Sequence, residues 1–335
     1  MNKRKWVMVG GDTLAGREVS DYIDEHHLPV ALVTTSSEPE ERVLTESEDE
    51  IAIMGPLDES SLEGAEAVLL AGSATVNERA RGLACGLSPR PAVIDLTGGL
   101  ESHPDARLRA PGIESAPRES ANPIEIVAHP AAVALAKLLR MLNAVARLRA
   151  AVVTVFEPAS ANGKAALDEL HNQTVSLFNF SQQPKKVFDA QVSFNLLPRY
   201  GHHAQVASLE ATERRIEQHL TTLLAPAGLP PVSLRVVQAP VFHGYCQSVW
   251  VEFEARPDVA SIERSLKQAG ADVRSAHHEP ASNTAAVGQS GIMVSDIEPD
   301  AANPRGVWLW LASDNLRTVA ETAVMIAGLA HKEHA

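Results

Sequence analysis

The two cysteines and a closely spaced histidine and tyrosine are side chains that could act as a nucleophile or carry a proton in a reaction. The two cysteines, Cys85 and Cys246, lie far apart in the sequence, so we expect no disulfide and interpret each as a buried free thiol. His243 and Tyr245 lie two residues apart in a stretch predicted to be a strand, where they would share one face and Cys246 would point to the other. A phenol with a pKa near ~10 is a poor base at neutral pH, so Tyr245 would accept a proton only in unusual surroundings.

The histidines do not predict a metal site. His129 and the neighbouring pair His202 and His203 have no partners at the spacing of zinc ligands. A histidine on a half-buried strand, such as His243, is more often a hydrogen-bonded structural residue than a base. We therefore predict that the chain binds no metal.

Residues 121–139 could position a cysteine nucleophile, yet they contain no cysteine. The segment reads as a strand, a proline turn and a helix that begins at Pro130. The free N–H groups and the positive dipole end of the first helical turn lower the pKa of a thiol there and keep it a thiolate. The first turn of this helix carries Ala132 instead. The methyl group of alanine is uncharged and does not ionise, so the helix dipole and the free N–H groups cannot activate it.

A glycine turn near the amino terminus could bind a phosphate. It follows an apolar run over residues 4–10 and precedes a stretch with helical spacing of apolar residues. Gly10 and Gly16 would allow a phosphate to approach the helix N-terminus closely. Asp12 would repel that phosphate, so we expect its carboxylate to turn away and cap the helix. The residues predicted to contact a dinucleotide are Gly10, Gly11, Asp12, Thr13, Leu14 and Gly16.

The amino-terminal half has the pattern of a parallel sheet with crossover helices. After the first strand, short apolar runs alternate with polar or helical stretches, and they lie at residues 29–35, 51–55, 66–72, 92–98 and 124–130. Buried parallel strands joined by helices give this alternation. We predict a Rossmann-like, dinucleotide-binding α/β domain.

From about residue 147 the pattern becomes that of an α+β domain on a largely antiparallel sheet. Strands are predicted at 150–160, 233–244, 245–255, 291–299 and 306–313, a strand with a turn at 191–201, and helices at 163–179, 207–225 and 260–270. The helix at 207–225 carries a Glu210–Arg214 pair on its polar side, and its apolar face, predicted to cover the core, consists of Leu209, Ile216, Leu220 and Leu223. A last helix begins at Ser313 or Asp314 as its cap.

Composition limits the class of protein. A chain of 335 residues suggests two domains. The formal charge of −13 argues against nucleic acid and anionic membrane surfaces as partners. No apolar run approaches the roughly 20 residues that span a bilayer, and the chain passes directly into a strand rather than a signal-peptide core. We expect a cytoplasmic protein.

Several motifs of the second half resemble the aspartate-semialdehyde dehydrogenase family. They are Gly163-Lys164, Glu169-Leu170, Gln173-Thr174, Phe194-Asn195 with Pro198, and Asp314-Asn315-Leu316-Arg317. The resemblance covers essentially the whole chain. It implies a Rossmann-like domain at 1–130 plus 314–335, an α+β substrate and dimerisation domain of the semialdehyde-dehydrogenase type at 131–313, and a homodimer with NADP-dependent oxidoreductase chemistry in amino-acid biosynthesis.

The positions that carry the family's chemistry are altered in this chain. The family cysteine corresponds to Ala132, its acid–base histidine to Tyr245, and its carboxylate-binding arginine to Gln238. A family glutamine beside the nucleophile corresponds to Glu157, which would repel an anionic substrate. Acidic residues also replace family cations at Glu101, Asp296 and Glu298.

The cofactor preference is predicted to change as well. After the second strand the family offers an arginine to the 2′-phosphate of NADP, but this chain has Ser37 and Glu38 there. Without the guanidinium that pairs with a phosphate, binding of NAD or NADP should be weakened, and NADP should be disfavoured.

Three hypotheses follow for the function. The first is a non-catalytic or severely impaired family member that keeps a dimeric scaffold and possibly NAD binding. The second is an active oxidoreductase on another substrate that uses Glu157, His243 and Tyr245 as a substitute pocket. The third is a protein-interaction module. The ligand, if there is one, is not identified by the sequence.

Overall fold

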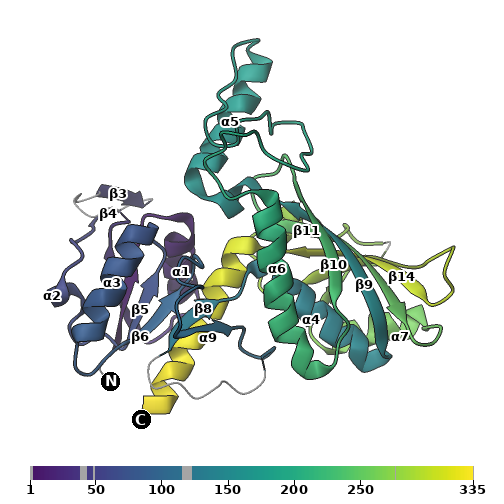
Figure 1. The fold of residues 1–335 in the computed structure, drawn as a ribbon, viewed down its shortest axis with the longest axis horizontal. Helices are drawn as coiled ribbons and strands as arrows, with labels where there is room; N and C mark the ends of the chain where they lie inside the picture. The colour runs from purple at the N-terminus through teal and green to yellow at the C-terminus, as the bar shows by residue number, and fades with distance from the viewer. Residues whose placement is uncertain (1–2, 38–43, 48–49, 115–122, 276, 335) are drawn as a thin grey trace. The chain divides into compact units, whose positions relative to one another are not determined.

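Six parallel strands form the sheet of the amino-terminal unit in the computed structural model, which describes residues 3–37, 44–47, 50–114, 123–275 and 277–334. The chain divides into unit 1, which comprises Met1–Ala128 and Val319–Ala335, and unit 2, which comprises His129–Thr318. Figure 1 shows the elements of both.

The sheet of unit 1 has the strand order β2-β1-β5-β6-β8-β7. Every pair of neighbouring strands is parallel, as the alternating pattern predicts. The strands are β1 (Arg4–Val9), β2 (Val30–Thr35), β5 (Ala67–Leu70), β6 (Ala92–Asp95), β7 (Ala106–Arg109) and β8 (Ile124–Val127).

Helices cover both faces of this sheet (Figure 1). Apolar residues of α1 (Leu14–Glu25) and of α9 (Asn315–His334) pack on one face, in a core that includes Val19, Ile23 and Ile326. The other face packs against α2 (Glu59–Leu62) and α3 (Ala74–Gly86). This two-sided burial explains why the central strands read as continuous apolar runs.

Two strand assignments in unit 1 differ from the prediction. The run at 51–55 adds no strand to the main sheet and contacts it through one bridge, from Gly55 to Thr35 of β2; β4 (Glu50–Ile53) pairs antiparallel with β3 (Leu44–Ser47) in a separate hairpin. The sixth strand of the sheet is instead β7, whose sequence is not apolar. Its side chains Arg107 and Arg109 form ion pairs with the buried Glu125 of β8, so charge pairing rather than an apolar pattern buries this strand.

Unit 2 is built on a second six-stranded sheet with the order β10-β9-β11-β14-β13-β12. The two outer pairs are parallel and the three inner pairs are antiparallel. The strands are β9 (Leu148–Glu157), β10 (Val232–Gln238), β11 (Tyr245–Phe253), β12 (Asp272–Val273), β13 (Met293–Pro299) and β14 (Gly306–Ser313).

The helices of unit 2 are α4 (Pro130–Val145), α5 (Gly163–Phe178), α6 (Leu209–Leu224), α7 (Val259–Gln268) and the short α8 (Asn283–Ala286). The predicted core-facing side of α6 is buried, and Arg214 Nη1 lies 2.6 Å from Glu210 Oε1. Asp314 caps α9 by accepting hydrogen bonds from the N–H groups of Leu316 and Arg317. These three predictions are confirmed.

The strand predicted at 191–201 is wrong. Apart from one bridge between Leu197 and Gln238, this segment is irregular and follows α5 in the part of unit 2 that extends away from its sheet (Figure 1). Two buried side chains of α5 hold the loop instead. Glu169 accepts the N–H groups of residues 186–188, and Gln173 accepts those of Val192 and Ser193. These contacts give a structural role to the Glu-Leu and Gln-Thr motifs.

Among the described helices, none is both long and apolar enough to cross a lipid bilayer.

Candidate functional site

The first turn of α4, where a nucleophile was expected by resemblance, is capped by histidine. His129 is the N-cap residue, and its Nδ1 accepts a hydrogen bond from the Ala131 N–H at 3.3 Å. The Nδ1 of His219, on α6, accepts the His129 N–H at 2.9 Å. Ala132 follows in the same turn and is fully buried. Amides that could have stabilised a thiolate are therefore already satisfied by imidazole rings.

Burial keeps the His129 ring neutral. Desolvation, followed by the positive charge of Arg215 and by His219, lowers its pKa well below the usual range for histidine. A neutral ring is required by the geometry too, because Nδ1 can accept the Ala131 N–H only without its own proton. His129 therefore acts as a cap and not as a cation.

Glu157 lies at the end of β9 with only 2% of its surface exposed. Its Oε1 accepts a hydrogen bond from Asn162 Nδ2 at 2.9 Å and lies 3.3 Å from the Tyr200 hydroxyl. Burial raises the pKa of this carboxyl to about 7, although both hydrogen bonds act in the opposite direction. Near neutral pH, Glu157 is therefore a mixture of acid and carboxylate.

Gln238 is paired with Glu157 across the parallel strands β10 and β9 and is also fully buried. Its Oε1 accepts the Tyr200 hydroxyl at 2.7 Å, and its Nε2 donates to the backbone oxygens of Glu157 and Ala239. A phenol has one proton, so Tyr200 donates to Gln238 or to Glu157 at any moment. The Gln238 amide is fully used inside the protein.

Tyr245 is the first residue of β11 and is fully buried. Its ring centroid lies 5.8 Å from that of His129. Burial raises its pKa well above the usual value for tyrosine, and the negative charge of Glu157 raises it further. Tyr245 remains protonated at neutral pH and is unsuited to act as the base.

The prediction that His243 shares a strand face with Tyr245 is wrong. β11 begins at Tyr245, and Gly244, with φ of +82°, bends the chain between the two residues. The alternation of a strand therefore does not extend to His243. Its ring is half-buried, which lowers its pKa, and the charge it senses is that of Asp314 rather than that of Glu157. Of the three predicted substitute residues, the structure brings Glu157 and Tyr245 together and leaves His243 apart.

Cys246 lies on the other side of β11, as the alternation predicts. It packs in a small apolar cluster with Ala281, Ala286, Met293 and Ala312. Burial raises the pKa of its thiol to about 11, so it is not a thiolate at neutral pH and cannot replace the missing nucleophile.

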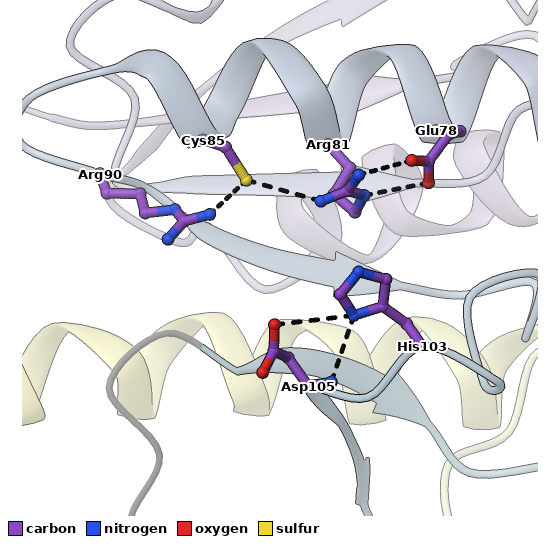
Figure 2. A network of polar contacts seen from close by, with 6 residues as sticks. All are labelled: Glu78, Arg81, Cys85, Arg90, His103 and Asp105. Atoms are coloured by element: carbon purple, nitrogen blue, oxygen red, sulfur yellow. Dashed lines mark hydrogen bonds and ion pairs between the residues drawn. The ribbon is translucent and has the colours of Figure 1, made fainter.

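Cys85, the other thiol, is only partly buried, contrary to the prediction, and belongs to a separate polar network on unit 1 (Figure 2). Its sulfur lies on α3 and accepts contacts from the guanidinium groups of Arg81 and Arg90. Arg81 is also paired with Glu78, one turn earlier on the helix. This network adds no residue to the positions that carry the family's chemistry.

The glycine turn of unit 1 is explained by packing alone. Gly10 has φ of +83°, and a Cβ there would lie 2.6 Å from the Gly72 backbone nitrogen. A Cβ on Gly16 would overlap the carbonyl oxygen of Gly10, and one on Gly11 would lie 2.9 Å from Thr34 Cβ. All three positions therefore need glycine whether or not a phosphate binds.

The cap of α1 is Thr13 and not Asp12, so that prediction is wrong. The Thr13 hydroxyl accepts the Gly16 N–H at 3.1 Å and donates to the Gly10 carbonyl at 2.8 Å, and the helix begins at Leu14. Asp12 instead accepts the backbone N–H of Ser37 at 2.7 Å and the Ser37 hydroxyl at 2.5 Å. The neighbouring Glu38 lies outside the described residues.

The remaining acidic replacements lie in different units. Glu101 follows β6 in unit 1, whereas Asp296 and Glu298 lie on β13 of unit 2. Within the described ranges, no group of three His, Cys, Asp or Glu residues could hold a metal ion.

The sequence did not predict three residues that contact Glu157 or His129. They are Asn162, Tyr200 and His219. They come from a loop, an irregular segment and a helix that are far apart in the chain. Their only sequence signal was proximity to recognised motifs, since Asn162 directly precedes Gly163 and Tyr200 follows Pro198.

Comparison with known proteins identifies relatives for this arrangement. Residues 138–318 match the family described as semialdehyde dehydrogenase, dimerisation domain. The chain is 30% identical over 200 residues to an aspartate-semialdehyde dehydrogenase of Rickettsia bellii, an alignment that spans 58% of each chain. It is 28% identical over 333 residues, 96% of each chain, to a USG-1 protein homolog of Pseudomonas aeruginosa.

A solved structure agrees with these matches. The structure of a probable aspartate-semialdehyde dehydrogenase from Pseudomonas aeruginosa superposes with a TM-score of 0.82 at 26% identity and covers 99% of both chains. Both units of this chain therefore have counterparts in a single solved structure. The chain belongs to the aspartate-semialdehyde dehydrogenase family.

Proposed function

We propose that this protein is a family member that has lost the dehydrogenase reaction, or retains only a severely impaired form of it, and that it keeps the homodimeric scaffold. The observation that carries the proposal is the first turn of α4. Ala132 stands where the resemblance places the nucleophile, and the His129 ring accepts a first-turn amide. Neither a methyl group nor an accepting imidazole can attack an aldehyde.

The surrounding side chains support the same conclusion. Glu157, Gln238 and Tyr200 hydrogen-bond to one another or to the nearby backbone, and all are wholly or largely buried. A carboxylate-binding site needs donors that point to the substrate. The donors of Gln238 both go to backbone oxygens. This cluster is therefore better suited to stabilising unit 2 than to binding an anionic substrate.

The homodimer is supported by the family match and by one face of the unit 2 sheet. Residues 138–318 match a dimerisation domain. On the strands β9, β11 and β14, the side chains that alternate with the core are Val152, Trp250, Trp308 and Trp310, and Trp308 is 45% exposed. An apolar row of this kind on an open sheet face is typical of a protein interface. We propose that two copies pair through it.

A second candidate is an enzyme that acts on a different substrate. One observation favours it: Glu157, with a pKa of about 7, adjoins Tyr200, which lines a cavity of about 600 Å³ in unit 2. A carboxyl with such a pKa is suited to proton transfer. Tyr245 lies beside Glu157 but stays protonated, and His243 does not face it, so this candidate rests on a single acid–base group.

Dinucleotide binding is proposed to be weak and to disfavour NADP. The glycine turn is accounted for by packing, and Ser37 already has an anionic partner in Asp12. Titration of the thermal unfolding midpoint with NAD, NADP and their reduced forms tests this, because a ligand that binds only the native state raises the midpoint.

The loss of activity is tested by supplying aspartate semialdehyde, phosphate and NAD or NADP to the purified protein. We expect no turnover from the natural chain, and none from Ala132→Cys, because base and carboxylate anchor are still absent. The fourfold variant A132C/E157Q/Q238R/Y245H restores the family residues, so it should recover measurable rates. Removing a catalytic nucleophile and base together typically costs on the order of 10⁶-fold in rate. Phosphate-dependent turnover by the natural chain would refute the proposal.

A further inference from the structure

The Asp12 carboxylate joins two loops at the carboxyl ends of neighbouring strands. Asp12 lies in the turn between β1 and α1, and Ser37 lies two residues after the end of β2. Oδ1 accepts the Ser37 backbone N–H at 2.7 Å and Oδ2 accepts its hydroxyl at 2.5 Å. Both oxygens of the carboxylate are engaged by the donors of a single residue.

Those two donors are of the kind that holds a phosphate. Backbone N–H groups and serine hydroxyls donate to phosphate oxygens at many nucleotide sites. A carboxylate that accepts both of them presents the same charge sign as a phosphate and leaves them no free hydrogen. In the described part of this loop, the Asp12 carboxylate thus takes the place of an external anion at Ser37.

The position in the sheet indicates which phosphate would compete. In a doubly wound sheet, the segment after the second strand lies beside the adenosine ribose of a bound dinucleotide. NADP carries its extra phosphate on this ribose, and NAD has only a hydroxyl there. Two anions at one pair of donors repel each other with an energy that falls only as the inverse of distance.

We propose that Asp12 is an internal anion that occupies the Ser37 donors and thereby selects against NADP. This inference rests on the proposed weak binding of dinucleotides and assigns a cause to its NADP part. The effect of Asp12 differs from that of the missing arginine, because Asp12 is a repulsive group that is present in the chain and that one substitution removes. NAD, which has no 2′-phosphate, is affected little by Asp12.

Binding of NADPH and NADH to Asp12→Ala tests the proposal, with affinity measured by nicotinamide fluorescence and by calorimetry. We expect the NADPH affinity to rise on the order of tenfold, since a like charge beside the phosphate is removed, and the NADH affinity to change by less than about threefold. Asp12→Asn keeps an acceptor for the Ser37 N–H without the charge and should give an intermediate gain even if Asp12→Ala folds poorly.

Two further variants identify the cause. Asp24→Ala removes an exposed negative charge near the end of the same helix α1, so it should leave both affinities unchanged. In Asp12→Ala combined with Ser37→Ala, the released hydroxyl is gone and only the backbone N–H remains, so part of the NADPH gain should disappear. A gain that persists undiminished in the double variant would overturn the role of the Ser37 hydroxyl.

The outcomes separate this inference from the proposal on which it rests. If the natural chain binds NADPH with micromolar affinity, the proposed weakening is wrong. If the natural chain binds weakly and Asp12→Ala and Asp12→Asn bind no better, the weakening stands and the role of Asp12 is wrong. Equal gains for NADH and NADPH would overturn the assignment to the 2′-phosphate.

Discussion

Glu157 shows how the interior of the fold changes the protonation of a single residue. The carboxyl is buried, and its pKa of about 7 is raised above its ordinary value of 4.5. The folded protein therefore binds a proton there that the unfolded chain has released. The stabilisation by the neutral form is fully present below about pH 4.5 and is lost as the pH rises to 7.

Replacing Glu157 with glutamine should remove this pH dependence. Glutamine keeps the oxygen that accepts from Asn162 and Tyr200 and cannot ionise. We expect Glu157→Gln to raise the free energy of unfolding by about 1–3 kcal/mol at pH 8 and to have little effect at pH 4.5. Urea unfolding at the two pH values measures the difference.

Glu169 provides a matched control for that substitution. It is also a buried glutamate, but its carboxylate accepts three backbone N–H groups of the loop after α5. A glutamine there offers one acceptor oxygen fewer, so Glu169→Gln should destabilise the protein at pH 8. If Glu157→Gln also destabilises at pH 8, then Glu157 is needed as a carboxylate.

At the scale of elements, the structure shows why a glycine turn is weak support for nucleotide binding. The turn between β1 and α1 packs so closely that Gly10, Gly11 and Gly16 are all required in the absence of any ligand. Thr13 completes it with a cap on α1. The motif therefore reports the contact between a strand and its crossover helix.

A pair of glycine-to-alanine substitutions separates packing from helix propensity. Gly16→Ala places a Cβ against the Gly10 carbonyl oxygen and should destabilise the protein by about 3 kcal/mol. Gly82→Ala lies in the exposed interior of α3, where a Cβ meets nothing within 4 Å, and should stabilise by about 0.5–1 kcal/mol. Both unfolding midpoints are measured without dinucleotide. An unchanged midpoint for Gly16→Ala would contradict the packing explanation.

At the scale of the whole molecule, the proposed dimer depends on the open face of the unit 2 sheet. Trp308 lies there opposite Trp250 on the neighbouring strand, and Val152 continues the row on β9. Large aromatic residues near the centre of an interface usually dominate its binding energy. The dimer is therefore expected to be sensitive to one charge in this row.

Trp308→Glu should weaken the dimer on the order of 30-fold or more, because it removes an aromatic anchor and buries a charge. Sedimentation equilibrium over a range of concentrations measures the change in dissociation constant. Phe180→Glu is the control, since Phe180 is 99% exposed and lies after α5, outside this row. If Phe180→Glu dissociates the dimer and Trp308→Glu does not, the copies pair through a different surface.

Most of the regular structure followed from local patterns. The apolar runs predicted the central parallel strands, and the spacing of Leu209, Ile216 and Leu220 predicted the buried face of α6. The segment 191–201 was assigned wrongly because its partners, Glu169 and Gln173, lie on the preceding helix. β7 was missed because its arginines are neutralised by Glu125, which lies 18 residues away from Arg107. Local patterns do not contain these pairings.

The sequence by itself determined most of the elements and the lack of a thiol at Ala132, because residue type and periodicity are local properties. Only the tertiary structure decided the state of the residues around it. The network of Glu157 joins residues up to 81 positions apart, and the cap of α4 joins residues 90 positions apart. Burial and hydrogen-bond partners set the pKa of each group and decide which donors are already used inside the protein. Both depend on packing between distant segments.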